Sequence, residues 1–388
     1  MISTPHLARL LDETPSPVHR APRALLEREL TERFPAAIRP IDVSVVPELS
    51  RFSDGTYGNG FLSLLLYCNG RNPTTRSADY PDGLCYCRGD AVFGIGAFVS
   101  GAGGGVHLVA PRGPACVAEA TRVATFLTRR WPGLRVYARH LPLDLHRAMV
   151  ATGAWLPIDS APWIASAPQE DETYHHRRLV LADLVEPGSA GPTVRLLPGQ
   201  ESREFRRKSR LAHNRFRNFL ERCGAAYVIR PQKASTVPLV LDLVRGHFED
   251  LRRAGTTPVG SSHYDYGGLA RLVPRPLDRF RCLVGFLEGP GWQRAVSFFA
   301  VEDLTNDTAG CYATITRRDP GVLPPDVDPR GYTAIASFAL IEICRRMLTE
   351  GFRILDLGGS ETADLDRFKR QLGAAPDPTA WAVFRGGQ

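Results

Sequence analysis

Apolar and polar positions along the first half of the chain follow two periods, and together they predict strands and helices in mixed order. A period of two indicates a half-buried strand, and apolar residues three or four apart indicate a helix. Residues 20–33 show the helical spacing, and the apolar run 61–67 fits either a strand or a short buried helix. The elements that follow are predicted as strands at 84–88, 91–99 and 106–109, a helix at 115–130, a strand at 134–138 and a helix at 143–152.

The same order of elements returns in the second half, after a segment rich in Glu, Pro and Gly at 169–199. A hairpin, a third strand, a loop, a helix, a strand and a helix recur, which indicates a duplicated unit. We therefore predict an α/β chain with two domains, 1–190 and 191–388. The pattern predicts strands at 226–230, 280–288, 293–302, 308–316 and 352–357, helices at 237–254, 266–273 and 332–350, and a last strand at 382–384 that closes this sheet.

The stretch 350–373 combines a helix exit, a short strand, a glycine turn and a second helix. The turn is Gly358, Gly359 and Ser360, directly after a strand that ends in Asp356 and Leu357. Glycine allows backbone N–H groups to approach a ligand because no Cβ stands in the way. This turn is therefore predicted to belong to a binding site.

Positive charge is concentrated in one predicted helix at 201–223. The chain carries a net charge of +7, and between Arg203 and Arg222 there are eight Arg or Lys against two Glu. Like charges four residues apart repel each other in an isolated helix, so this imbalance favours a phosphate-rich partner over a merely solvated face. The candidate contacts are Arg206, Arg207, Arg210 and Arg217, opposite a predicted buried stripe of Phe205, Leu211, Phe216, Phe219 and Leu220.

Composition adds limits on location and on metals. The N-terminus has no basic region followed by an apolar run, and no apolar run is long enough to cross a bilayer, so we expect a cytoplasmic protein with reduced thiols. Cys85 and Cys87 form the one close cysteine pair of the eight cysteines and lack a second pair at ligand spacing, so no metal site is predicted. The run 174–178 with its two histidines is expected to be a solvated strand edge.

Three features of the second half carry a resemblance to a known family. They are the basic helix RRKSRLAHNRFRNF, the strands AVSFFAVED and GCYATITRR before a proline loop and a long helix, and GFRILDLGGSETADLDRFKRQLG. Residues 196–388 resemble the Fem peptidyltransferase-like branch of the GNAT acyltransferase superfamily, where Asp-Leu-Gly-Gly at a strand end is followed by a polar loop and Phe-Lys. The first half resembles, more weakly, the degenerate first unit of tandem proteins such as the Fem peptidyltransferases and the lysylphosphatidylglycerol synthase C-terminal region.

This resemblance implies two tandem GNAT-like domains, each a mixed, mostly antiparallel central sheet flanked by helices. It also implies transfer of an acyl group from an activated carrier, either acyl-CoA or aminoacyl-tRNA. CoA-dependent GNAT enzymes hold the pyrophosphate in a glycine-rich turn at a helix N-terminus. The corresponding place, 327–334, has one glycine, two acids upstream and a bulky tyrosine, so this cradle is predicted to be lost.

We therefore expect an aminoacyl-tRNA-dependent transferase that acts on an amine or hydroxyl of a small-molecule or peptide acceptor, in specialised metabolite biosynthesis such as that of an antibiotic. The carrier is a co-substrate, and no other cofactor is predicted. An acyl-CoA-dependent N-acyltransferase and a non-catalytic RNA-binding or regulatory module are the alternatives.

The resemblance also assigns roles to residues. Lys369 would stabilise charge on the tRNA acceptor end or on the oxyanion, and Phe368 would shape the pocket. Apart from the resemblance, the place of Asp356 at the strand end suits a role in orienting the acceptor amine. A surface lysine and a turn-capping aspartate are the alternative interpretations of Lys369 and Asp356. The predicted substrate contacts are Gly358, Gly359 and Ser360 of the turn, Tyr312 and Thr314 on one face of the strand 308–316, and His263 in a polar loop.

Overall fold

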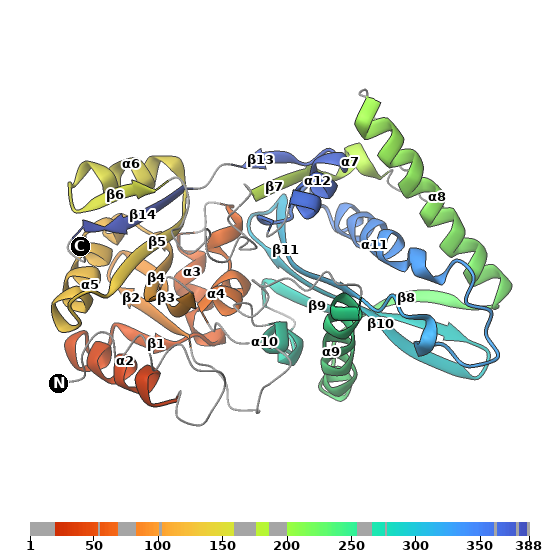
Figure 1. Cartoon of the computed structure of the whole chain (residues 1–388), viewed down its shortest axis with the longest axis horizontal. Helices are drawn as coiled ribbons and strands as arrows, with labels where there is room; N and C mark the ends of the chain where they lie inside the picture. Colours follow the sequence, from red (N-terminus) through yellow and green to blue (C-terminus); the bar gives the residue numbers. More distant parts are fainter. Residues whose placement is uncertain are drawn as a thin grey trace.

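The protein folds into two seven-stranded sheets, each flanked by helices (Figure 1). The computed structural model describes residues 20–52, 55–68, 83–100, 103–158, 176–185, 200–253, 266–275, 278–360, 363–377 and 380–385. Both sheets are mixed and mostly antiparallel, so the predicted fold class is confirmed. Among the described helices, none is long and apolar enough to cross a membrane.

The first sheet has the strand order β1-β2-β3-β4-β5-β14-β6, and its single parallel pair is β4 with β5. Helices α2 (Arg20–Arg33), α5 (Cys116–Arg130) and α6 (Leu143–Ala151) cover one face through a shared apolar cluster. On the other face lies α4 (Phe61–Cys68), which settles the ambiguous run 61–67 as a buried helix. The strands are β1 Ile38–Pro40, β2 Leu84–Arg88, β3 Ala91–Ser100, β4 Gly103–Arg112, β5 Arg135–Leu141, β6 Trp155–Ile158 and β14 Ala380–Phe384.

The second sheet has the order β13-β7-β12-β11-β10-β9-β8, and its parallel pair is β11 with β12. Helix α11 (Ile335–Thr349) packs on one face, and α9 (Val237–Arg253) and α10 (Tyr266–Arg271) pack on the other. The long α8 (Gln200–Arg222) lies across α11, and α12 (Ala363–Gln371) follows β12. The strands are β7 His176–Val180, β8 Ala226–Pro231, β9 Phe280–Gly289, β10 Trp292–Asp303, β11 Thr308–Thr316, β12 Ile354–Asp356 and β13 Ala375–Asp377.

Each sheet contains one strand from the other half of the chain. The C-terminal β14 pairs with β5 and β6 in the first sheet, and β7 pairs with β12 and β13 in the second. The prediction that 382–384 closes the second sheet was therefore wrong, because an apolar run predicts a strand but not its partner. Strand pairing crosses the predicted boundary at residue 190 in both directions.

The two units share one apolar core, and a buried carboxylate joins them inside it. Glu302 on β10 accepts the backbone N–H groups of Phe61 (2.7 Å) and Leu62 (2.8 Å), the first residues of α4. A carboxylate there satisfies free donors and interacts favourably with the helix dipole. Gly60 is required at this contact, since a Cβ would lie 2.4 Å from a Glu302 carboxylate oxygen and 2.3 Å from the Tyr312 hydroxyl. Burial raises the pKa of Glu302 to about 7.

We predict that Glu302 makes folding stability depend on pH. The pKa of Glu302 is raised from 4.5 to about 7 in the folded chain, so between these values the unfolded chain is ionised first and rising pH favours unfolding. The free energy of unfolding should lose about 1 kcal/mol per pH unit from this group in that window. Urea unfolding of Glu302→Gln should lack this dependence, whereas Glu302→Ala should cost roughly 2 kcal/mol or more at pH 7, because two helix N–H groups lose their acceptor.

The exposed Glu249 on α9 provides the matched control, and Glu249→Gln should keep the pH dependence of the wild type. An unchanged slope in Glu302→Gln would contradict the assignment.

Candidate active site

Strands β11 and β12 separate in the middle of the second sheet. β12 pairs with the first three residues of β11, Thr308 to Gly310, and then ends at Asp356. The equivalent pair in the first sheet, β4 with β5, stays together for five residues. Among the described strands, none pairs with 311–316 on the side that β12 leaves. We call these residues the open edge of β11.

The turn that follows β12 is closed by its own aspartate. Asp356 is fully buried, and its Oδ1 accepts the backbone N–H of Gly358 at 2.9 Å. Its Oδ2 lies 3.3 Å from Nε of Arg178 on β7. Burial raises the pKa of Asp356 to about 6, although the Gly358 hydrogen bond and the Arg178 charge oppose that shift. Asp356 therefore caps this turn, and its role toward an acceptor amine stays a prediction.

Lys369 on α12 is buried against the same turn, so it is not a surface lysine. Its Nζ donates to the carbonyl oxygens of Leu357 (2.8 Å), Gly358 (3.2 Å) and Gly359. Burial raises the pKa of the Cys311 thiol at the start of the open edge, and the Thr314 hydroxyl and the Lys369 charge oppose that shift. A positive charge is thus held where the two strands separate.

The two remaining residues predicted around the turn are also placed there. Phe368 is half-buried and packs on the apolar cluster beneath α11. Ser360 is fully buried, and its hydroxyl has no hydrogen-bond partner among the described residues. A buried hydroxyl without a protein partner has spare capacity for a ligand.

A bulge in β11 separates Tyr312 from Thr314. Opposite β10, the register passes from Ala313 to Cys311 and skips Tyr312. Tyr312 consequently packs in the core shared by the two units together with Ala313, while the exposed Thr314 places its hydroxyl 3.2 Å from the Cys311 sulfur. The prediction that Tyr312 and Thr314 share a face was wrong, because a bulge shifts the alternation by one residue.

The first unit contributes residues that the sequence pattern did not single out. Tyr57, in a short helical turn before α4, stacks on Tyr312 with ring centroids 4.2 Å apart, and its carbonyl accepts the Tyr312 hydroxyl at 2.6 Å. Its ring also lies against Gly358, where a Cβ would be 2.6 Å away. His176 packs edge-on against Tyr57 and is buried, so the expected solvated strand edge at 174–178 was wrong for this residue.

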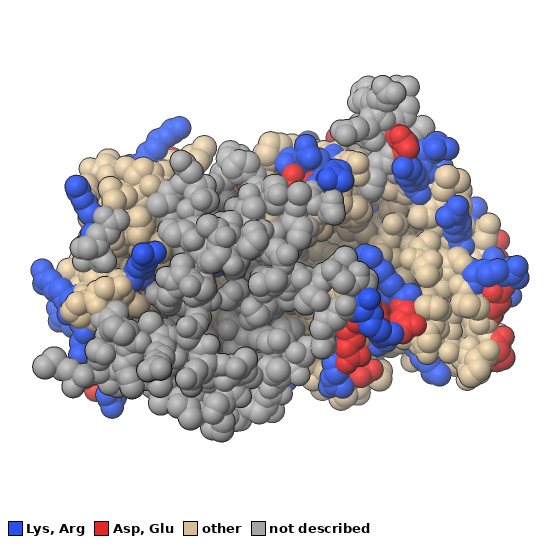
Figure 2. Space-filling view, in the orientation of Figure 1, with Lys and Arg blue, Asp and Glu red and all other residues tan. Residues whose placement is uncertain are grey.

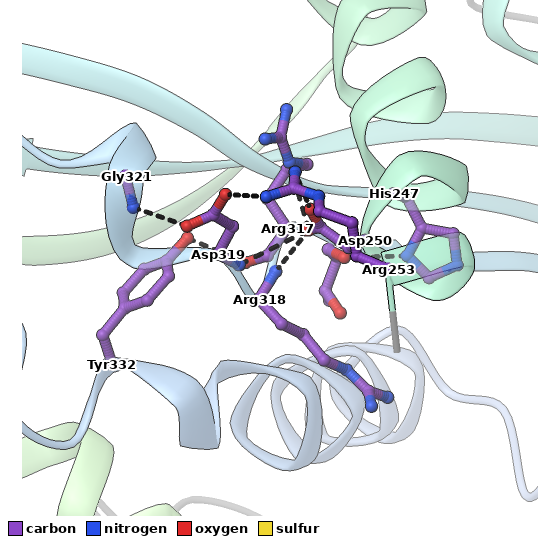
Figure 3. A network of polar contacts seen from close by, with 9 residues as sticks. His247, Asp250, Arg253, Arg317, Arg318, Asp319, Gly321 and Tyr332 are labelled. Carbon is purple, nitrogen blue, oxygen red and sulfur yellow. Dashed lines mark hydrogen bonds and ion pairs between the residues drawn. The ribbon is translucent and has the colours of Figure 1, made fainter. Parts of the chain in front are cut away.

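The loop that leaves β11 is fastened to α9 by ion pairs (Figure 3). Asp250 accepts the backbone N–H groups of Arg318 (3.3 Å) and Asp319 (3.4 Å) and pairs with Nε of Arg317 (3.3 Å). Arg253 joins Asp250 (3.0 Å) to Asp319 (2.9 Å). These contacts fix the course of the chain from the open edge toward α11.

Helix α8 covers the turn at which α11 begins. Gly331 precedes that helix with φ +88°, and a Cβ on it would lie 2.7 Å from the backbone oxygen of Arg215 in α8. Tyr332 is fully buried next to Phe219, and its hydroxyl donates to the Arg317 carbonyl at 2.8 Å. Arg222 pairs with Asp328 at 3.7 Å. The residues at this turn do not fit a pyrophosphate cradle, since the α8 backbone takes the adjacent position.

Basic side chains lie along the exposed side of α8 (Figure 2), where the sequence predicted four arginine contacts. Arg207 and Arg217 are exposed, and Arg210 is half-buried. The buried stripe differs from the predicted one, because Leu211 is 45% exposed whereas Ser209 and His213 point inward. His213 lies 3.2 Å from Glu342 of α11, and burial lowers its pKa. The side chain of Arg206 and the whole of His263 lie outside the described residues.

No family model and no curated protein matches the sequence. Solved structures do match the fold. A conserved protein of unknown function from Bacteroides thetaiotaomicron is 13% identical, with a TM-score of 0.54 over 90% of this chain and 99% of that one. L-PGS from Bacillus licheniformis is 10% identical, with a TM-score of 0.51 over 90% and 94%. FemX is 8% identical, with a TM-score of 0.50 over 89% and 96%.

These similarities define the class of fold. The chain consists of two units in tandem, each a mixed sheet flanked by helices, and it shares this fold over almost its whole length with FemX and L-PGS. The predicted likeness in fold to the Fem-type proteins is confirmed. Sequence identities of 8–13% establish the fold alone, because proteins that share a fold can catalyse different reactions.

We predict that Gly358→Ala destabilises the chain more than Gly89→Ala does. Both glycines have positive φ, +67° and +54°, so alanine costs about 1 kcal/mol at each. At Gly358 the new Cβ would also meet the Tyr57 ring, adding roughly 1–3 kcal/mol. At Gly89 nothing lies within 4 Å. Urea unfolding of both variants measures the difference, and equal losses would show that Tyr57 does not press on this turn.

Proposed function

We propose that the chain is an acyltransferase that moves an aminoacyl group from aminoacyl-tRNA to an amine or hydroxyl of a small-molecule or peptide acceptor. The role in specialised metabolite assembly is part of this proposal. The two GNAT-like units and the open edge of β11 beside a buried ammonium group support acyl transfer. The choice of aminoacyl-tRNA as the carrier rests on the packing and the charge of α8.

One helix provides the observation that favours tRNA over CoA. The inner side of α8 lies on Gly331, at the turn where CoA-dependent GNAT enzymes bind pyrophosphate. Its outer side presents Arg207, Arg215 and Arg217 to solvent. Arginines spaced along a helix suit a phosphate backbone, whose binding depends mainly on charge neutralisation and needs no sequence motif. The resemblance to the Fem and lysyl-transferase branches, which use aminoacyl-tRNA, agrees with this choice.

The reaction requires alignment of two reactants and a path for one proton. The acceptor nitrogen attacks the ester carbonyl carbon, a C–N bond forms, and the C–O bond to the terminal ribose breaks. The amine loses one proton and the ribose oxygen gains one. With a hydroxyl acceptor, oxygen takes the place of nitrogen and an ester forms.

In this reaction Lys369 acts as a positioning residue that also supplies charge. An ammonium group has three N–H donors, and Lys369 directs them at three turn carbonyls. It therefore holds the turn rigid and keeps a positive charge next to the open edge, where a developing oxyanion is stabilised without a direct hydrogen bond. Asp356 closes the same turn, and Ser360 and Thr314 have hydroxyl groups available to the substrates.

A direct test is incubation of the protein with total tRNA charged with a mixture of labelled amino acids. We expect label to move from tRNA to a small-molecule or peptide acceptor present in a cell extract of low molecular mass. Lys369→Met should reduce the rate by about 100-fold or more, as expected for loss of electrostatic stabilisation. Stabilisation against heat by CoA thioesters, without release of label, would instead support the acyl-CoA alternative. Full transfer by Lys369→Met would remove this residue from the mechanism.

We also predict that tRNA binding depends on α8. The double variant Arg207→Gln/Arg217→Gln should bind tRNA about tenfold more weakly near physiological salt, and the slope of log K against log salt should fall by roughly one to two units. Filter binding across a salt series measures both values. Arg245→Gln/Arg367→Gln removes the same charge from exposed positions of α9 and α12 and serves as the control. Equal weakening in both double variants would refute a specific role for α8.

A further inference from the structure

A second concentration of arginines lies on the first unit, between α2 and α5. A hollow of about 490 Å³ is lined by Arg33 at the end of α2 and by one side of α5. The contribution of α5 is Arg122, Thr125, Phe126, Arg129 and Arg130, spaced so that all lie on one helical face. Figure 2 shows blue side chains at the left edge, where Figure 1 places the ends of these helices.

The charge of this hollow is only partly balanced. Arg130 forms two hydrogen bonds of 2.8 Å with Glu29, and Arg122 bonds Glu119 at 3.2 Å. Among the described residues, four arginines against these two glutamates leave two positive charges, those of Arg33 and Arg129, both exposed. Basic residues near a helix C-terminus also stabilise the helix dipole. That explanation applies to Arg33, Arg129 and Arg130 in the last turns of α2 and α5, but not to Arg122, which lies eight residues before the end of α5.

The floor of the hollow is aromatic. Phe126 is half-buried and meets the ring of Phe34 edge-on at 5.6 Å. The guanidinium groups of Arg122 and Arg33 lie 5.2 Å and 5.8 Å from the Phe34 ring centroid. These contacts hold the arginine side chains over an apolar base without using up their N–H donors. Arginine donors beside an aromatic surface are the combination that binds phosphate together with a base.

We propose that the hollow between α2 and α5 binds the phosphate groups of nucleotide units, presented either by a nucleic-acid backbone or by a free nucleotide. Arg33 and Arg129 supply the uncompensated charge, and Arg122 and Arg130 are held in place by Glu119 and Glu29. The volume is that of a typical small-ligand site and is open to solvent on the helix surface. This inference does not depend on the proposed function, since neither the open edge of β11 nor α8 contributes to the hollow.

Isothermal titration calorimetry with ADP, and filter binding of uncharged total tRNA across a salt series, test the proposal on the full chain. The variant Arg33→Ser/Arg129→Ser should weaken binding of at least one of these ligands by about tenfold. Both residues are exposed, and a thermal melt checks that the fold is unchanged. Loss of ADP binding identifies a nucleotide site. A change confined to tRNA, with a smaller salt slope, identifies a nucleic-acid contact.

The control is Arg28→Ser/Arg147→Ser, which removes the same charge from exposed positions of α2 and α6 outside the hollow. The proposal is overturned if neither ligand binds, or if the control variant weakens binding as much as the hollow variant. For tRNA, the hollow variant is also made in the Arg207→Gln/Arg217→Gln background. A further loss of tRNA affinity in that background shows that the hollow binds tRNA independently of α8. If tRNA affinity falls no further there and ADP binding is also unchanged, the proposal is overturned.

Discussion

The contact between Glu302 and the first turn of α4 is the constraint on which the geometry of the site depends. It places a carboxylate from the second unit on free N–H groups of the first, inside a core that both units share. Burying a charge is costly unless hydrogen bonds compensate for it, so the two N–H groups make this arrangement tolerable. Tyr57 lies three residues before Gly60, and the contact therefore also sets the position of Tyr57 against Tyr312 and Gly358.

The exchange of strands adds a second, topological constraint. Because β14 completes the first sheet and β7 completes the second, neither half of the chain has a full sheet by itself. Arg178, which pairs with Asp356, lies on the exchanged strand β7. The turn after β12 therefore contacts the exchanged strand β7 through the Asp356–Arg178 pair, and it contacts the first unit through the Tyr57 ring. The first unit thus has a structural role in the site, whatever else it binds.

Much of the fold could be predicted from the sequence, since the repeated order of strands and helices depends on local apolar periodicity. The glycine turn at Gly358 was also found from its local sequence. Lys369 was singled out by the family resemblance, and its bonds to the turn carbonyls were not predicted. Contacts such as Tyr57 with Gly358 join residues about three hundred positions apart and leave no local pattern. The bulge at Tyr312 was missed because regular alternation gives no sign of a local shift in strand register. The exposure of Leu211 was missed because helical spacing does not determine the angle at which a helix packs.

In the proposed function, helix α8 bears on both candidate carriers. Gly331 is the residue that a pyrophosphate cradle would need, and here its lack of a side chain serves a different purpose, since it allows the α8 backbone to approach the start of α11. The burial of Phe216 and Phe219 fixes the rotation of α8, and that rotation turns Arg207 and Arg217 outward. Covering the turn and displaying the arginines are therefore consequences of a single packing arrangement. A sequence change that freed the turn for CoA would have to move α8, and it would displace the arginines at the same time.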